Sequence, residues 1–82
     1  MHISVLTPDK EIFDGEISSA KVPGVSGQFE ILNNHAPIVS ALGEGQVRLV
    51  KENGEKITFG IEKGFVEVLK NKVALLVQGY QE

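Results

Sequence analysis

Few side chains in this sequence could hold a metal ion or carry out catalysis. The chain has two histidines, His2 and His35, and it has no cysteine. The lack of cysteine excludes a thiolate zinc site, a cysteine nucleophile and a disulfide framework. A zinc site needs three or four ligands at suitable spacing, and these histidines could add only carboxylates such as Glu16 or Glu30. We therefore expect neither a metal nor a cofactor.

A catalytic nucleophile with its base is equally poorly supported. Ser40, His35 and Asp14 supply the residue types of a hydrolase triad, but the sequence has no Gly-x-Ser-x-Gly elbow to present the serine. A small hydrolase that uses His35 therefore lacks a credible set of nucleophile, base and orienting group. Residues 24–27 are rich in glycine but lack the Lys-Ser/Thr pair and the helix of a phosphate-binding loop, so they predict a surface turn. We predict that the chain is not an enzyme by itself.

Length and charge limit the remaining classes of protein. The chain has 82 residues, which predicts one domain, residues 1–82, with a thin hydrophobic core. Eight basic residues against 11 acidic ones give a net charge of −3. Nucleic-acid-binding domains instead carry a clustered basic face, so we expect no nucleic-acid partner. No apolar run approaches the roughly 20 residues of a membrane-spanning helix, and no signal peptide is evident, which fits a reducing cytoplasm.

The elements that must position these residues are β-strands. Nine glycines and three prolines interrupt the chain too often for helices of about 11–12 residues. Between them, apolar and polar residues alternate with period two, as in strands that bury one face. The sequence therefore predicts an all-β domain, a flattened sandwich or barrel of roughly eight to ten short strands. The expected inward residues are Ile3, Val5, Ala20, Val22, Phe29, Ile31, Val47, Leu49, Ile57, Phe59 and Ile61.

Two turns can be placed from local patterns. A three-residue loop at Glu52-Asn53-Gly54, with Gly54 in the left-handed region, sets Leu49 opposite Ile57, whereas a two-residue loop would mix the two faces. Asp14-Gly15 predicts another turn or a bulge, because this dipeptide is typical of both.

Residues 65–78 fit either an apolar helical stripe or two strands. Four valines favour strands, and Lys70-Asn71-Lys72 interrupts the apolar pattern near its middle. We predict two strands joined by a two-residue loop at Asn71-Lys72. This loop pairs Val68 with Leu75 and Val66 with Val77, which keeps apolar partners on one face.

One segment near the middle of the chain does not show the usual alternation. Ile38 and Leu42 lie in one phase, while Val39 and Ala41 lie in the other, so both faces carry apolar side chains. Pro37 cannot donate a backbone hydrogen bond, which favours an edge position. The outer apolar face of such an edge either is covered by the chain's own loops or is available to a partner, and the residues alone leave both open.

Motifs spread along the chain match one known family in order and spacing, from residue 1 to about residue 78. They are Thr7-Pro8, Phe13-Asp14-Gly15-Glu16, Pro23-Gly24-x-x-Gly27-x-Phe29, Leu32-Asn33-Asn34-His35-Ala36-Pro37, Val47-Arg48, and Gly64-Phe65-x-Glu67-Val68 with Asn71-x-Val73. This pattern resembles the epsilon subunit of F-type ATP synthases, called delta in mitochondria. The family commonly has Pro-Gly in place of Asn33-Asn34, but asparagine tolerates the left-handed conformation, so the turn can survive.

The resemblance implies a fold and a role. The family's N-terminal domain is a β-sandwich of two five-stranded sheets with no active site of its own. It belongs to the central stalk of the rotary motor, where it binds the gamma subunit and rests on the ring of c subunits. It thereby couples rotation, driven by proton or sodium flow, to ATP synthesis. The resemblance implies a peripheral location at the cytoplasmic face of the bacterial plasma membrane, through the complex only.

The resemblance also implies two interfaces. The gamma-facing surface overlaps the two-faced apolar segment and maps to His35, Ala36, Pro37, Ile38, Ser40 and Leu42. The loop that faces the c-ring maps to Val25, Ser26, Gly27, Gln28 and Glu30. Family members often carry an acidic residue at the position of Gln28. Glu30, which shares the strand phase of Gln28, could supply that charge instead.

Most family members continue into a C-terminal helical hairpin that can inhibit ATP hydrolysis and in some members binds ATP. No residues of this sequence match that hairpin, so we expect a coupling subunit without this regulation and without an ATP site. The alternative is a free-standing β-sandwich that binds a small ligand or a peptide. It predicts a concave pocket with converging polar groups, although the sequence offers no tryptophan and places its single tyrosine, Tyr80, at the tail.

Overall fold

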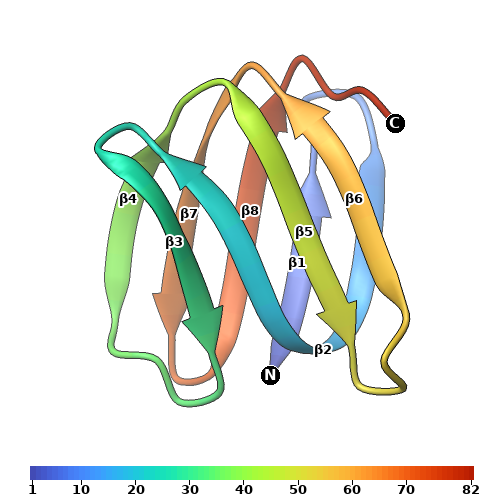
Figure 1. Cartoon of the computed structure of the whole chain (residues 1–82), viewed down its shortest axis with the longest axis vertical. Helices are drawn as coiled ribbons and strands as arrows, with labels where there is room; N and C mark the ends of the chain where they lie inside the picture. The colour runs from blue at the N-terminus through green and yellow to red at the C-terminus, as the bar shows by residue number, and fades with distance from the viewer.

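The computed structural model describes all of residues 1–82, and the chain consists of strands and loops (Figure 1). No helix is present that could span a membrane. The predicted all-β class is confirmed, with one strand, β2, much longer than expected. The eight strands are β1 (His2–Leu6), β2 (Glu11–Gly24), β3 (Gly27–Leu32), β4 (Ile38–Leu42), β5 (Gly45–Lys51), β6 (Lys56–Ile61), β7 (Lys63–Leu69) and β8 (Lys72–Gln78).

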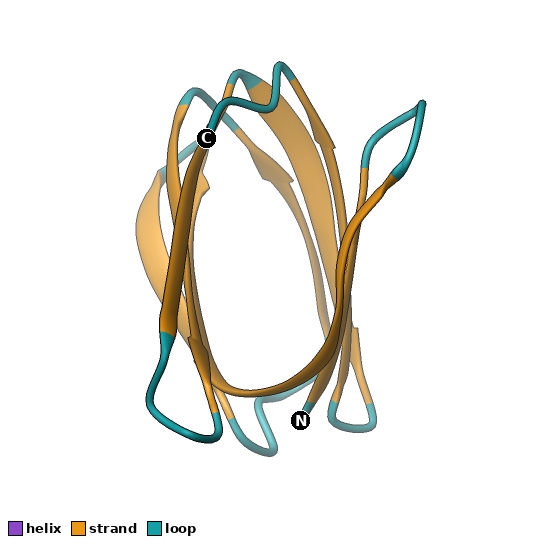
Figure 2. Cartoon of the chain, turned by 90° about the vertical axis from the view of Figure 1, so that its right-hand side faces the viewer, coloured by secondary structure: helices purple, strands orange, loops and turns teal.

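The strands form two layers that share β2, which curves from one layer into the other (Figure 2). The first layer runs β4-β7-β8-β1 and ends with residues 11–16 of β2, with β1 and β8 parallel. The second layer places the rest of β2 between β3 and β5, with β6 beyond β5. An irregularity in the pairing between Ile17 and Ser19 lies where β2 changes layer. An isolated bridge between Gly60 and Gln81 adds a short pairing beside β6, so the first layer has five strands, counting the first part of β2, and the second has four strands and this bridge, close to the expected two sheets of about five strands.

The core lies between the layers and contains only apolar side chains. Seventeen residues are buried, and none of them is polar or charged. The inward phase predicted from period-two alternation is confirmed, with Phe29 and Ile57 packing against the core rather than fully inside it. Each strand therefore packs one face against the core, which requires apolar residues there, and its other face can carry polar or apolar residues.

The predicted register of the β5–β6 hairpin is confirmed. Leu49 pairs with Ile57 and Val47 with Phe59. Gly54 has a φ of 90° and donates its backbone N–H to the carbonyl of Lys51 at 2.9 Å. Only a residue without a Cβ adopts this conformation easily, which explains why the three-residue loop could be recognised.

Two other predicted turns are wrong. The β7–β8 loop is Lys70-Asn71, both with positive φ, so Val68 pairs with Val73 and Val66 with Leu75. The Asn71 side chain accepts a hydrogen bond from the backbone of Asn34 at 2.8 Å, which holds Asn71 in the loop. Because the register is displaced by an even number of residues, the faces are unchanged.

Asp14-Gly15 forms neither a turn nor a bulge. Both residues lie in the middle of β2 and pair regularly with Ser4 and Ile3 of β1. A Cβ at Gly15 would lie 3.0 Å from the ring of Phe13, so the glycine makes room for that aromatic ring.

Candidate functional site

The predicted partner segment lies along β4, which is an edge strand for most of its length. It pairs with β7 on one side and meets β2 only where Leu42 pairs with Gly24. The side chains of Ile38, Ser40 and Leu42 share the inward phase, Leu42 is only 3% exposed and Ile38 packs against the core. The expectation that Leu42 faces a partner therefore needs correction, because its side chain belongs to the core.

The outward phase of β4 is part of an apolar face. Ala41 pairs with Phe65 of β7, Phe65 with Leu76 of β8, and Leu76 with Leu6 of β1, so these four side chains form one row across four strands. Val39, further along β4, and Leu69, further along β7, lie on the same face as this row. Val39 is 74% exposed, Phe65 59%, Leu69 51% and Leu76 49%. Below, the apolar face means Leu6, Val39, Ala41, Phe65, Leu69 and Leu76.

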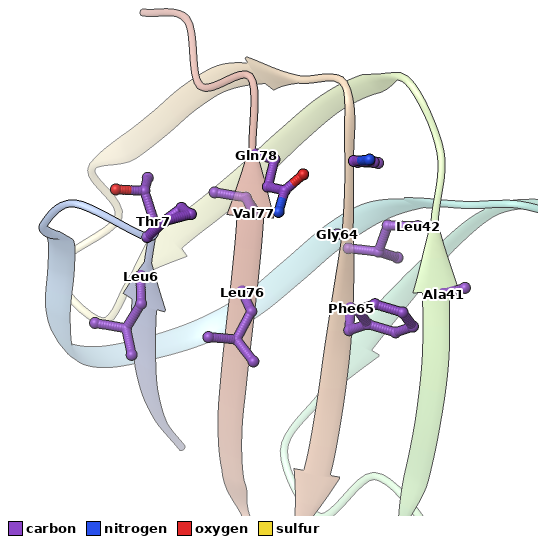
Figure 3. A pocket seen from close by; sticks show the side chains of 11 residues that line it. Leu6, Thr7, Ala41, Leu42, Gly64, Phe65, Leu76, Val77 and Gln78 are labelled. Atoms are coloured by element: carbon purple, nitrogen blue, oxygen red, sulfur yellow. The ribbon is translucent and has the colours of Figure 1, made fainter.

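A groove of about 530 Å³ opens on this face (Figure 3). All four residues of the apolar row line it, and Thr7, Lys63 and Gln78 add polar groups to the lining. Gly64 is part of the lining, and a Cβ at that position would overlap the carbonyl oxygen of Leu76. The apolar part of this lining suits the apolar side chains of a second molecule.

Sequence reasoning missed most of the apolar face. It named His35, Ala36 and Pro37, which lie in the loop before β4 with Ala36 and Pro37 exposed, but none of Leu6, Phe65 and Leu76. The sequence signal for these residues was a large apolar side chain in the outward phase of a strand. Three separate strands, β1, β7 and β8, each carry one. Only the strand order brings these residues together.

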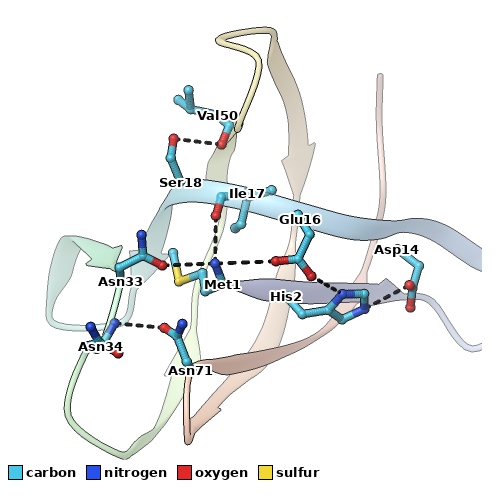
Figure 4. Close-up of polar contacts among 10 residues, drawn as sticks. All are labelled: Met1, His2, Asp14, Glu16, Ile17, Ser18, Asn33, Asn34, Val50 and Asn71. Carbon is cyan, nitrogen blue, oxygen red and sulfur yellow. Dashed lines mark hydrogen bonds and ion pairs between the residues drawn. The ribbon is translucent and has the colours of Figure 1, made fainter.

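A polar cluster occupies the other end of the same layer (Figure 4). His2 faces Asp14 through Nε2 and Glu16 through Nδ1, both at 2.9 Å. The hydrogen bond to Glu16, assisted by the charge and hydrogen bond of Asp14 and opposed by desolvation, raises the pKa of His2 above its ordinary value of 6.5. The Ser4 hydroxyl donates to Asp14 at 2.7 Å and, together with His2, lowers the pKa of that carboxyl. Two carboxylate partners favour an imidazolium that donates from both nitrogens.

The residues considered for catalysis are not brought together. Strands β7, β8 and β1 lie between β4, which carries Ser40, and the part of β2 that carries Asp14. The His35 ring faces the carbonyl oxygen of Ala36 at 2.7 Å, and Asp14 is already bound to His2 and Ser4. A triad needs its three groups within hydrogen-bonding reach, so this arrangement does not form one.

Loops at the end of the sandwich near the N-terminus are tied to one another (Figure 4). The amino group of Met1 donates to the carbonyl of Ile17 at 3.1 Å and to the side chain of Asn33 at 2.9 Å. Asn34 has a φ of 63°, which confirms that asparagine supplies the left-handed residue of this turn. Its backbone N–H donates to Asn71 at 2.8 Å, so the β3–β4 and β7–β8 loops are joined.

The second predicted contact region is the β2–β3 hairpin. Val25 and Ser26 form its two-residue loop, and Val25 is 68% exposed. Gln28 and Glu30 both point outward from β3, as their shared phase predicts. The backbone N–H of Val25 donates to the carbonyl of Ala41 at 3.2 Å, and that of Gly43 donates to Pro23 at 2.8 Å. These bonds join the loop to the β4 edge of the apolar face.

Known proteins resemble this chain over most of its length. The epsilon chain of ATP synthase from Chlorobaculum tepidum is 43% identical over 76 residues, which are 93% of this chain and 86% of that protein. The epsilon chain from Leptospira borgpetersenii is 44% identical over 93% of this chain and 59% of its own length. A chain of Euglena gracilis mitochondrial ATP synthase has the same fold with a TM-score of 0.88 and 21% identity. The match covers 95% of this chain and 50% of that one.

The match to the family covers nearly the whole chain. The model of the ATP synthase delta/epsilon chain β-sandwich domain matches residues 1–81. The epsilon chain of Caulobacter vibrioides is 36% identical over 95% of this chain and 90% of that protein. The chain therefore belongs to the delta/epsilon family of ATP synthase subunits, in which it corresponds to the β-sandwich domain.

Proposed function

We propose that this domain is a non-catalytic central-stalk subunit of a proton-translocating F-type ATP synthase. In this role it binds the gamma subunit and contacts the c-ring, and it couples ion-driven rotation to ATP synthesis. Its location is then the cytoplasmic face of the bacterial plasma membrane, where the complex holds it. Membership in the family supports this role, as does the fold shared with a chain from the central stalk and c-ring of Tetrahymena thermophila mitochondrial ATP synthase, at a TM-score of 0.83.

The apolar face is the observation that carries the proposed contact with gamma. Each square ångström of apolar surface removed from water contributes about 25 cal/mol, and exposed apolar patches of this kind mark protein contacts. Phe65 and Leu76 sit side by side at its centre, and the groove beside them can receive an apolar side chain of the partner. The loop residues His35, Ala36 and Pro37 extend this surface beyond the start of β4. Gamma is therefore assigned to the outward side of β4, with Val39 and Ala41 in place of Ile38, Ser40 and Leu42.

The β2–β3 hairpin is the proposed contact with the c-ring. Val25, Ser26, Gly27, Gln28 and Glu30 are exposed, and their mixture of one apolar tip with polar neighbours suits a polar partner loop. The hydrogen bonds from this hairpin to the β4 edge give the two contacts a fixed geometry relative to one another.

A free-standing ligand-binding module remains the second candidate, and the groove is the observation that favours it. The groove is continuous with an apolar face that extends beyond it to Val39 and Leu69. A small ligand would leave those side chains exposed, whereas a protein partner would cover them. The continuity favours gamma.

Binding to the cognate gamma subunit tests the proposal. We expect the wild-type chain to form a stable complex with gamma and Phe65→Asp to weaken it at least about 100-fold, because a buried carboxylate would replace an apolar anchor. Thr58→Asp, an exposed position on the opposite layer, is the control and should bind like the wild type. Calorimetric titration gives the dissociation constants. Failure of the wild type to bind gamma would refute the function, and full binding by Phe65→Asp would refute this surface.

A further inference from the structure

One carboxylate interrupts the apolar face. Glu67 lies between Phe65 and Leu69 in the outward phase of β7, and its cross-strand neighbours are Val39 on β4 and Ala74 on β8. Its nearest neighbours along the strand and across both adjacent strands are thus apolar. The side chain itself is exposed, so in the isolated domain water solvates its charge.

Glu67 has no partner within the chain. The ion pairs of the structure join Met1, His2 and Lys51 to Asp14, Glu16 and Glu55, and no side-chain hydrogen bond reaches Glu67. Lys72 is diagonal to it across β7 and β8, a position about 7–8 Å away between backbones in such a pair, and the two do not form an ion pair. The charge of Glu67 is therefore free to interact with another molecule.

A partner that covers the apolar face must also cover Glu67. Val39 on one side is 74% exposed and Leu69 on another is 51% exposed, so a contact that buries both passes over the carboxylate between them. Removing an ionised carboxylate from water without a counter-charge is strongly unfavourable. The surface therefore favours a partner that brings a cation or other hydrogen-bond donors to this point over a partner that brings only apolar groups.

We propose that the gamma subunit, if it occupies the apolar face as proposed above, places a basic side chain over Glu67. Arginine fits best, because its planar guanidinium donates two parallel hydrogen bonds to a carboxylate and is less strongly hydrated than an ammonium group. The apolar residues supply most of the contact area, and Glu67 determines which segment of the partner fits and in which orientation. Glu67 is thus a specificity determinant of the interface.

The test compares variants in their affinity for the cognate gamma subunit. Glu67→Gln keeps the size of the side chain and removes its charge, and we expect it to bind gamma at least about tenfold more weakly. Glu67→Lys should bind more weakly still, because it sets two cations against each other. Glu52→Gln, in the exposed β5–β6 loop, is the matched control and should bind like the wild type. Urea unfolding of each variant checks that the domain remains folded.

The outcomes separate this inference from the proposed function. If Phe65→Asp loses gamma while Glu67→Gln or Glu67→Lys binds as tightly as the wild type, the apolar face is the gamma surface and the role of Glu67 is refuted. If the wild-type chain does not bind gamma at all, the proposed function fails and this inference fails with it. A loss confined to the Glu67 and Phe65 variants supports both.

Discussion

Two adjacent leucines of β8 provide a test of which face of the first layer is the core. Leu75 is fully buried and pairs with Val66 of β7, whereas Leu76 points outward, pairs with Phe65 and is 49% exposed. Replacing each by alanine makes the same chemical change in two environments. The difference between the variants therefore measures the environment alone.

The burial of each leucine determines how much unfolding free energy its variant should lose. Leu75→Ala removes the branched end of a buried side chain, which at about 0.8 kcal/mol per carbon costs about 2.4 kcal/mol, and the cavity raises the total to about 3–5 kcal/mol. Leu76→Ala leaves no cavity and loses about half of the transfer term, about 1 kcal/mol. A domain of this length has a free energy of unfolding of about 4–12 kcal/mol, so the first variant is close to the limit of folding.

Urea unfolding followed by circular dichroism measures both values. With a slope of about 1 kcal/mol per molar urea, Leu75→Ala should lower the midpoint by about 3 M or more, and Leu76→Ala by about 1 M or less. The affinity for gamma should show the opposite order. Folded Leu76→Ala should bind gamma more weakly than folded Leu75→Ala, because it has lost part of the apolar face. Equal losses of stability in the two variants, or a larger loss in Leu76→Ala, would refute the assignment of faces.

Two further predictions concern the backbone and the pH. In Gly64→Ala the new methyl group would overlap the carbonyl oxygen of Leu76, so β7 and β8 must separate, and we expect urea unfolding to show a loss of about 1–3 kcal/mol; a variant as stable as the wild type would contradict this close approach. The pKa of His2 is raised from 6.5, chiefly by Glu16, so its stabilising effect is complete below pH 6.5 and is lost as the pH rises through the higher pKa of the folded state. The Tm advantage of the wild type over His2→Asn should therefore shrink as the pH rises above 6.5, and an advantage that grows would show that the sign is wrong. Asp14, whose pKa is lowered chiefly by Ser4, contributes a constant term in that range, since its effect changes only below 3.8.

Local sequence patterns were sufficient to predict a loop where a single residue type determines the backbone conformation. Gly54 has a φ that other residues avoid, so the β5–β6 loop and its register followed from one glycine. The β7–β8 loop lacks such a residue, because Lys70, Asn71 and Lys72 are all polar and any two of them could form the loop. A contact distant in sequence, from Asn34 to Asn71, favours the observed pair, and local reasoning had no access to it.

The candidate surface was harder to predict than the fold. In β4 both phases are apolar, so the sequence contains no information on whether Leu42 or Val39 faces the core. The strand order decides this, because β4 packs beside β7 and its residues Ile38, Ser40 and Leu42 pair with β7 residues on the inward side. Phe65 and Leu76 join Ala41 only through pairings between strands. Residues that are apart in sequence thus form a surface that no single segment predicts.

The difference between the two outer faces supports the proposal that the apolar face contacts a partner, because the fold does not require it. Across the second layer the corresponding outward row consists of Glu30, Lys21, Arg48 and Thr58, all polar, and Leu32 at the end of β3 is a single exposed apolar residue beside it rather than part of an apolar row. Folding alone would permit an equally polar row on the first layer, since outward positions are free to be polar in a sandwich.

The position of the β2–β3 hairpin then has a mechanical consequence in the proposed role. Its backbone is hydrogen-bonded to β4 at Ala41, a member of the apolar row, so no loop lies between the proposed c-ring contact and the proposed gamma contact. The connection consists of the Gly24–Leu42 pair and the two backbone hydrogen bonds beside it, and paired backbone groups hold the two segments together without an intervening flexible loop. A force applied at Val25 therefore reaches the proposed gamma surface through paired backbone, which is the property that the proposed coupling element between a rotating ring and a shaft requires.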